Sequence, residues 1–324
     1  MADMMLKESD LVNKRDIDEI VQLLSIKNSS FEFQELITRA KEMTTSRLGR
    51  RGHLWCAIGL DYKPCPMVCK HCALSKKWNI VKESRELKAE EVVDWARYFI
   101  AEGASFLVLR TTEAYPVEHL AELGRAIKKI MPDGVKLVAN TRELTTKQAG
   151  MLSSVGFDGI YMTIRLREGI DTNFNIEKRH RSINNAKKAG LEVYSLVEPI
   201  GPEHTYEEIA ESIVELREFI KPAVIGAMAR VPVEGTPLSR FGKISQDELV
   251  KITAVIVLSI LPALDNVRLV CSHPPYEMLA EAGANAFVVE VGAIPRDKYF
   301  SSKEWQKFTV DDAKKFLANA GYVV

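Results

Sequence analysis

The sequence predicts an α/β protein built as a (β/α)₈ barrel of the TIM type, preceded by a short helical extension. Three observations predict this fold. After Gly52, eight short apolar runs alternate with amphipathic segments, each run is followed by a helix or a long loop, and several helices end at a glycine. Because the number of strands does not establish that a sheet closes, an open doubly wound sheet is the alternative. In both folds the chemistry lies at the carboxyl ends of the strands.

Two helices open the chain. Apolar residues recur at helical spacing from Ile17 to Leu24 and again from Phe33 to Ala40. We therefore divide the chain into an N-terminal helical extension over residues 1–50 and a barrel over residues 51–324. The two helices are expected to close the bottom of the barrel or its seam.

The barrel elements follow in alternation. The predicted strands are Leu54–Leu60, Ser105–Leu109, Val135–Ala139, Gly159–Thr163, Leu191–Val197, Val224–Met228, Val267–Val270 and Ala286–Glu290. The predicted helices cover residues 89–102, 117–130, 145–154, 174–189, 206–220, 246–261, 276–282 and 311–320. Glycine-containing turns, such as the one at Gly103 and the one at Gly190, join several of these helices to the next strand.

Composition and charge disfavour several classes of protein. The chain has 324 residues, of which 46% are hydrophobic and 27% charged, an ordinary balance for a globular protein. Its 44 basic and 44 acidic residues cancel, which disfavours a protein that binds nucleic acid by neutralising phosphates. No apolar run approaches the length of a membrane span, and the N-terminus has no apolar signal segment. We therefore expect a cytoplasmic protein whose partners are neither nucleic acid nor membrane.

The most informative feature is a cluster of three cysteines directly after the first predicted strand. Cys65, Cys69 and Cys72 have the spacing C-x3-C-x2-C, whereas Cys56 and Cys271 stand apart. Three thiolates on one tight loop can hold three corners of a cubane iron–sulfur cluster and leave the fourth iron open. The alternative is a structural zinc ion, which needs a fourth protein ligand. Three residues are available for that fourth position: His71, His53 and Cys56.

This loop resembles the cluster-binding loop of the radical S-adenosylmethionine (SAM) superfamily, in which three cysteines follow the first strand of a β/α barrel. The resemblance implies a [4Fe–4S] cluster on Cys65, Cys69 and Cys72, with SAM chelating the fourth iron. It also implies a one-electron donor such as ferredoxin or flavodoxin, whose electron cleaves SAM to methionine and a 5′-deoxyadenosyl radical that abstracts a substrate hydrogen. One departure is His71, because an aromatic residue usually precedes the last cysteine.

The same resemblance implies which residues bind SAM. The segment Arg110–Glu113 ends the second predicted strand, where the family often has Gly-Gly-Glu, so Glu113 is expected to receive the SAM amino group. Glu168 is expected to bond the SAM ribose, and Arg181 resembles the arginine that meets the SAM carboxylate in biotin-synthase relatives. Asn140 closes the third strand, where family members line the lumen. The residues expected to bind the cofactor are Glu113, Thr111, Thr112, Asn140, Glu168 and Arg181.

Charged residues at the strand ends indicate a small substrate that carries a carboxylate. Along the fourth predicted strand, Tyr161, Thr163 and Arg165 share one face, which suits a polar barrel lumen. Arginines recur at other strand ends, and guanidinium groups converging at one mouth favour a carboxylate in addition to that of SAM. Glu198 and Glu290 can pair with these arginines or hold a substrate amine. The residues expected to act on the substrate are Arg230, Arg268, Arg165 and Glu290, with Arg110, Arg142 and Arg296 at further strand ends.

The C-terminal half resembles the biotin-synthase-like subgroup. Val231–Leu238 is similar to the segment after the sixth strand in biotin synthase and in an [FeFe]-hydrogenase maturase. Glu281–Asn285 resembles part of the region that biotin and thiamin synthases share, about residues 225–324 here. Biotin synthase holds a second, sulfur-donating cluster with three more cysteines, and this chain has only Cys56 and Cys271 left. Sulfur insertion from an auxiliary cluster is therefore not expected.

Among enzymes without a second cluster, the nearest likeness is to the maturation enzymes of [Fe]-hydrogenase called HmdB or HcgA. The likeness lies in Gly201–Thr205, Ser272–Pro275 and Val291–Asp297. It implies a role in making the iron-guanylylpyridinol cofactor. The alternatives are a methylornithine-synthase-like mutase, an aromatic amino-acid lyase and an archaeal-type lipoyl synthase component. The non-enzymatic alternative is a zinc-stabilised binding protein.

Overall fold

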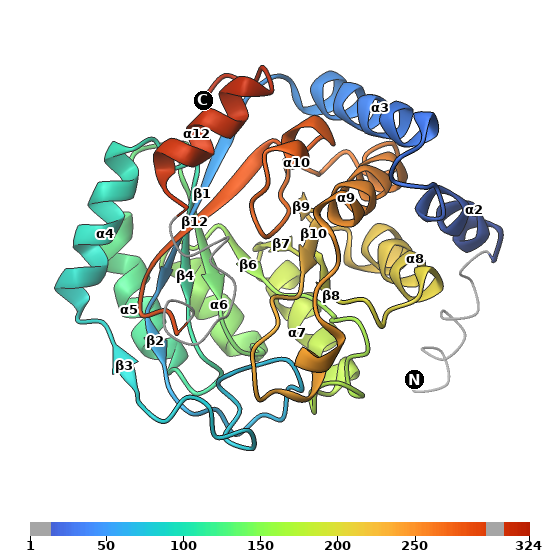
Figure 1. Ribbon diagram of the computed structural model, residues 1–324. Helices are drawn as coiled ribbons and strands as arrows, with labels where there is room; N and C mark the ends of the chain where they lie inside the picture. Colours follow the sequence, from blue (N-terminus) through green and yellow to red (C-terminus); the bar gives the residue numbers. More distant parts are fainter. Residues whose placement is uncertain (1–13, 296–307) are drawn as a thin grey trace.

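Eight parallel strands form one sheet that curls into a barrel, with helices on its outside (Figure 1). The computed structural model describes residues 14–295 and 308–324. The strands follow the order β11-β9-β7-β6-β5-β4-β1-β12. The two end strands meet through a bridge between Cys271 and Ala286 and a 3.1 Å bond from the Asn285 N–H to the Val270 carbonyl. The predicted barrel is therefore confirmed, with a narrow seam between β11 and β12.

Strands and helices alternate along the chain, as predicted. The strands are β1 His53–Gly59, β2 Asp61–Tyr62, β3 Arg85–Glu86, β4 Phe106–Arg110, β5 Lys136–Asn140, β6 Gly159–Tyr161, β7 Glu192–Tyr194, β8 Val197–Ile200, β9 Val224–Ile225, β10 Ala227–Ala229, β11 Leu269–Val270 and β12 Ala286–Gly292. The helices are α2 Lys14–Leu24, α3 Phe31–Leu48, α4 Ala89–Ala101, α5 Val117–Lys128, α6 Thr146–Ser154, α7 Ile176–Lys188, α8 Tyr206–Glu215, α9 Gln246–Ile260, α10 Met278–Glu281 and α12 Val310–Asn319. A π-helical turn, Leu216–Ile220, extends α8, and a 3₁₀ helix covers Pro237–Phe241. Among these described helices, none has both the length and the apolar character needed to cross a membrane.

The alternation of side chains along the strands divides the core in two. In β1, Leu54, Cys56 and Ile58 pack outward against the helices, whereas Trp55 and Ala57 point into the lumen. This period of two is what a closed barrel requires, because one face of each strand fills the interior and the other carries the helical layer. An inward-facing side chain near the carboxyl end of a strand can therefore line a site at the mouth of the barrel.

An aromatic cluster fills the lower part of the lumen. Trp55 stacks on Phe106 with ring centroids 5.1 Å apart, and Tyr194 meets both rings edge-on at 5.5 and 5.8 Å. The bottom of the barrel is thus closed from inside. The N-terminal helices lie outside, with α2 packed on α8 and α9, and α3 packed on α9 and α10. The N-terminal helices therefore add to the outer helical layer next to α9 and α10, the helices that flank β11 in the chain.

The fifth and sixth barrel strands are each broken into two pieces, which the sequence did not indicate. β7 continues as β8, and β9 continues as β10, so that β8 and β10 form a separate pair above the main sheet. Gly226, between β9 and β10, has a φ of 147°, and a Cβ there would lie 1.8 Å from the Cys271 carbonyl oxygen. Only glycine allows this approach. The break carries Glu198 and Met228 onto the wall of the site described next.

Candidate active site

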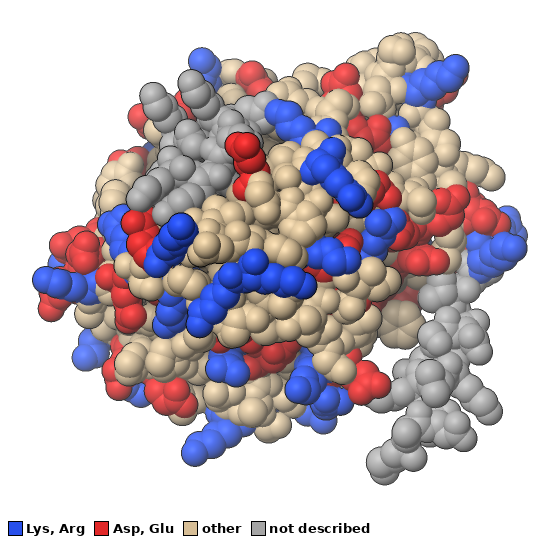
Figure 2. Space-filling view, turned by 60° about the horizontal axis from the view of Figure 1, so that its bottom comes forward, with Lys and Arg blue, Asp and Glu red and all other residues tan. Residues whose placement is uncertain are grey.

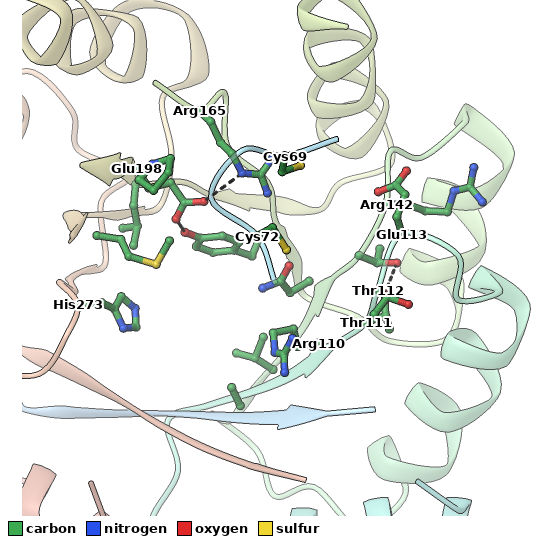
Figure 3. Close-up of a pocket in the computed structure, with 18 of the residues that line it drawn as sticks. Cys69, Cys72, Arg110, Thr111, Thr112, Glu113, Arg142, Arg165, Glu198 and His273 are labelled. Atoms are coloured by element: carbon green, nitrogen blue, oxygen red, sulfur yellow. Dashed lines mark hydrogen bonds and ion pairs between the residues drawn. The ribbon is translucent and has the colours of Figure 1, made fainter. Parts of the chain in front are cut away.

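A cavity of about 400 Å³ opens at the carboxyl ends of the strands. Its floor is apolar and includes Trp55, Val108, Leu196, Val224 and Val288. Its upper wall carries the three clustered cysteines and a ring of charged residues: Arg110, Glu113, Arg142, Arg165, Arg179, Glu198 and Glu290. Figure 3 shows Cys69 and Cys72 between the Arg165–Glu198 pair on one side and Thr111, Thr112 and Glu113 on the other. The cavity therefore has an apolar base beneath a charged rim, next to three thiols.

The cysteine loop is held by hydrogen bonds within its own backbone. The Cys65 N–H donates to the Leu74 carbonyl (2.6 Å), and the Lys76 N–H donates to the Cys65 carbonyl (2.9 Å). Trp78 Nε1–H donates to the Cys69 carbonyl (2.9 Å). These bonds fold the loop back on itself, so that all three cysteines line the same cavity.

Burial keeps the three cysteines protonated in the bare protein. It raises the pKa of Cys69 to about 12 and also raises the pKa values of Cys65 and Cys72. The positive charge of Arg165 lowers the pKa of both Cys69 and Cys72, against the effect of burial. Since thiolates are the metal-binding form, ligation displaces these protons. Three thiols beside a cavity with cationic neighbours fit the donor set of a site-differentiated [4Fe–4S] cluster.

The possible fourth ligands for zinc lie in different places. Cys56 packs in the outer core, and His53, at the start of β1, approaches Ser105 Oγ at 3.2 Å. His71 lines the cavity, where burial lowers its pKa to about 3. Within residues 14–295 and 308–324, no three His, Cys, Asp or Glu side chains are grouped around a point where one metal ion could sit, and this includes the three cysteines, which share the cavity wall. Two of the three residues proposed to complete a zinc site are therefore away from the cysteine loop.

The segment expected to meet the SAM amino group lies on the cavity wall. Thr111, Thr112 and Glu113 all line the cavity, and burial raises the pKa of Glu113. The segment is held by Asp61, a residue that sequence reasoning missed. The Asp61 carboxylate accepts from the Thr112 N–H (2.7 Å) and from the Thr112 hydroxyl (2.5 Å). Asp61 is only 1% exposed. Its position two residues after β1, at the carboxyl end of a strand, could have indicated a place near the site.

The arginine on α7 that reaches the cavity is Arg179, not Arg181. Arg181 is exposed and lies 3.7 Å from Glu177 on the outer face of the helix. Arg179 is 4% exposed, lines the cavity, and holds its guanidinium 3.9 Å from the centroid of the Phe174 ring. The prediction for Arg181 is therefore wrong in position, since its side chain points away from the site.

Glu168 lies behind the cavity wall instead of on it. Its carboxylate accepts from the Arg165 N–H (3.1 Å) and from the Thr172 hydroxyl, and lies 3.8 Å from Arg179 Nε. With these contacts it supports the two arginines that do line the cavity. A direct contact with the SAM ribose disagrees with this placement. Asn140, at the end of β5, lines the cavity as expected.

Two carboxylate–arginine pairs stand above the apolar floor. Arg110 Nε lies 3.2 Å from Glu290 Oε1, and Arg165 Nε lies 3.9 Å from Glu198 Oε1. Tyr161 completes the second pair by donating its hydroxyl to Glu198 Oε2. Burial raises the pKa of Glu198, and burial next to this carboxyl raises that of Tyr161. The inward face predicted for the fourth strand thus supplies Tyr161 and Arg165, whereas Thr163 donates to the Leu196 carbonyl (2.7 Å).

Two predicted substrate residues lie elsewhere. Arg230 is buried in an ion pair with Glu203 outside the cavity, where its Nη2 donates to Glu203 Oε2 at 2.8 Å. Arg268 precedes β11 instead of following it, so it lies at the opposite end of the barrel, where it donates to Glu192 (2.7 Å). Both pairs contribute to structure, and the prediction that these arginines face the substrate is wrong. Arg296 lies outside the described residues.

Comparisons with known proteins agree with this fold. No family model matches the chain. It is 26% identical over 255 residues to the biotin synthase of Streptomyces avermitilis, covering 75% of this chain and 64% of that protein. It is 24% identical over 249 residues to the biotin synthase of Clostridioides difficile, covering 74% and 75%. It is 28% identical over 233 residues to that of Kocuria rhizophila, covering 68% and 49%. The chain thus spans from half to three quarters of the length of these three relatives.

Solved structures share the barrel along nearly the whole chain. Methylornithine synthase (PylB) superposes with a TM-score of 0.77 at 18% identity, covering 94% of this chain and 93% of that one. The [FeFe]-hydrogenase maturase HydG superposes with a TM-score of 0.75 at 15% identity, covering 98% and 77%. Fold, site and relatives together define an enzyme with a radical SAM barrel. The chain is thus similar in sequence to biotin synthases and similar in fold to radical SAM barrels, and this likeness implies a [4Fe–4S] cluster and SAM as its cofactors.

Proposed function

We propose that the enzyme binds SAM against its cysteine loop and a small carboxylate-bearing substrate over the apolar floor of the same cavity. The observation that carries the proposal is the one cavity shared by three cysteines and two arginine–carboxylate pairs. When bound, the cluster and SAM supply a 5′-deoxyadenosyl radical that removes a hydrogen atom from the substrate. Cys65, Cys69 and Cys72 would hold the cluster.

The two sides of the cavity offer different contacts. On one side, Thr111, Glu113 and Asn140 present polar groups near Arg179, which suits the amino and carboxylate groups of SAM. On the other side, Arg165 and Glu198 stand near Arg110 and Glu290, above the apolar floor. A substrate with a carboxylate at one end and an apolar body would satisfy both the arginines and the floor.

The protein's own residues bind, orient and exclude water. The apolar floor excludes water from the reacting carbon. Arg165 fixes a carboxylate, and Glu198, whose pKa burial raises and whose Oε2 accepts from the Tyr161 hydroxyl, can take up a proton. Substrate and SAM are thus held in one enclosed space, so that a reactive radical meets its intended partner first.

The pathway we propose is the synthesis of the iron-guanylylpyridinol cofactor of [Fe]-hydrogenase, in the cytoplasm. Its support is the sequence likeness of Gly201–Thr205 and Ser272–Pro275 to the maturation enzymes of that hydrogenase. In agreement with a role at the site, His273 lines the cavity. In the Gly201–Thr205 loop, the Gly201 N–H donates to His204 Nδ1 (2.9 Å), so His204 stabilises the loop itself.

The proposal is tested with anaerobically reconstituted enzyme, SAM and dithionite, with 5′-deoxyadenosine measured by chromatography. A panel of amino acids and aromatic carboxylic acids, each paired with its primary amide, is added in deuterated form. We expect at least one acid, and not its amide, to increase 5′-deoxyadenosine formation and to transfer deuterium to it. Stimulation by the amides as strongly as by the acids would contradict the carboxylate assignment.

A further inference from the structure

The segment that carries the three cysteines is strongly one-sided in charge. Residues 63–82 contain five lysines and no aspartate or glutamate, in a chain whose 44 basic and 44 acidic residues otherwise cancel. Two of these lysines are engaged inward, since Lys63 lies 3.6 Å from the buried Asp61 and Lys70 lies 3.0 Å from Asp171. The other three, Lys76, Lys77 and Lys82, are exposed. The outer face of the cysteine loop therefore carries three exposed lysines, with the exposed Glu83 and Glu234 at its edge.

A second segment extends this face. The Leu238 N–H of the 3₁₀ helix donates to the Lys70 carbonyl (3.1 Å), and Gly235 lies against Ile80. The helix adds the exposed Arg240, whose guanidinium lies 4.7 Å from the ring centroid of Phe241. Figure 2 shows Lys and Arg side chains gathered across the face that comes forward when the lower loops of Figure 1 are turned toward the viewer. Arg and Phe are residue types enriched in protein–protein interfaces, and exposed lysines at the rim attract a partner of opposite charge.

This face lies directly behind the cluster-binding cysteines. The backbone of Lys76 bonds to that of Cys65, and the Trp78 indole bonds to the Cys69 carbonyl. Lys77 Nζ lies 5.3 Å from the centroid of the same Trp78 ring. One layer of residues therefore separates solvent from the cysteines on this side, whereas the cavity side is reserved for SAM and substrate. An electron that enters through this face therefore crosses few residues before it reaches the cysteine loop.

We infer that the basic face, formed by Lys76, Lys77, Lys82 and Arg240 around Trp78 and Phe241, is the docking surface for the electron donor, and that the donor is an acidic redox protein. The inference rests on the proposed function, since a radical SAM enzyme needs one electron for each SAM that it cleaves. Opposite charges raise the rate of encounter by roughly 10- to 1000-fold, in a manner that salt suppresses. Because the net charge of the chain is zero, the charge that orients the donor has to come from a local patch such as this one.

The test uses the reconstituted enzyme and a purified flavodoxin, an acidic one-electron carrier, with binding measured by surface plasmon resonance. The variant is Lys77→Glu/Lys82→Glu. The control is Lys129→Glu/Lys188→Glu, which changes the net charge equally at the ends of α5 and α7 on the far side of the barrel. At low salt, we expect the Kd of the variant to rise by about tenfold or more and its salt dependence to flatten. The control should stay close to the wild type.

A second measurement separates docking from chemistry. Reduction of the cluster by flavodoxin hydroquinone should slow in the Lys77→Glu/Lys82→Glu variant, whereas reduction by dithionite should not change. Equal flavodoxin binding by variant, control and wild type would overturn the docking surface. If no protein forms 5′-deoxyadenosine with dithionite, the proposed function fails, and the binding data still decide whether this face takes an acidic protein.

Discussion

At the scale of single residues, the clearest lesson comes from α7. Arg179 and Arg181 are two positions apart, so on a helix of 3.6 residues per turn they point in nearly opposite directions. Arg179 shares its face with Ser182, Ile183 and Ala186, all of which are buried. The helical periodicity of this segment therefore predicts that Arg179 faces inward. The motif likeness alone, used without that periodicity, selected Arg181 instead.

Replacing Arg179 should weaken SAM binding more than replacing Arg181. In Arg179→Gln, loss of the charge that faces Glu143 and the cavity should raise the Kd for SAM by about tenfold or more, the size expected for losing one charge-assisted contact. Arg181→Gln, on the exposed face, should leave the Kd unchanged. Equilibrium dialysis of reconstituted enzyme with labelled SAM measures both. Equal effects of the two substitutions would show that Arg179 does not contact the cofactor.

The residue predictions that rest on short motifs were confirmed as lying in the cavity, whereas those that depend on contacts made only in the folded protein were not. The cysteine spacing and the position of Glu113 follow directly from short motifs, so their common location in the cavity was predictable. Arg230 was misassigned because its partner, Glu203, is defined only by the folded loop after β8. Arg268 was misassigned because it precedes its strand and so lies at the amino end of the barrel. Strand direction, applied strictly, would have removed Arg268 from the site.

At the scale of elements, the barrel depends on a narrow closure between β11 and β12. The side chain of Asn285 replaces a ladder hydrogen bond there, because its Oδ1 accepts from the Val270 N–H at 2.8 Å. Asn285 is fully buried, and its Nδ2 reaches the Arg51 carbonyl at 3.5 Å. The sequence predicted the strands on either side but not this closure, which is a contact between residues fifteen positions apart.

Asn285→Ala should therefore destabilise the protein. It leaves the buried Val270 N–H without its acceptor, at a cost of about 1–3 kcal/mol in the free energy of unfolding. Asn184→Ala, at an exposed position on α7, should change this free energy by less than about 0.5 kcal/mol. Urea unfolding followed by circular dichroism compares the two. A neutral Asn285→Ala would mean that the seam is held by the backbone bridges alone.

The breaks between β7 and β8 and between β9 and β10 could not be predicted from the pattern of apolar residues. The sequence predicts one strand in each case, Leu191–Val197 and Val224–Met228, because no turn signal interrupts either run. The break at Gly226 follows from the close approach of the Cys271 carbonyl, a tertiary contact. Its consequence is functional, because the displaced pieces bring Glu198 and Met228 to the cavity.

At the scale of the whole molecule, the barrel separates three tasks. Its lower end is filled by Trp55, Phe106 and Tyr194, its upper end encloses the cavity, and the outer face of the cysteine loop carries the positive charge. We propose that substrate and SAM approach from one side of the cysteines and electrons from the other. This arrangement follows from placing the cysteine loop directly after β1, at the carboxyl end of the sheet.

The central claim is that Cys65, Cys69 and Cys72 hold a [4Fe–4S] cluster whose open iron binds SAM. Electron paramagnetic resonance of the anaerobically reconstituted, dithionite-reduced protein, recorded with and without SAM, tests it most directly. We predict the signal of a reduced [4Fe–4S] cluster that changes shape when SAM is added, and that disappears in Cys69→Ala. A colourless protein that contains zinc and gives no such signal would contradict the account and leave the barrel as a binding scaffold.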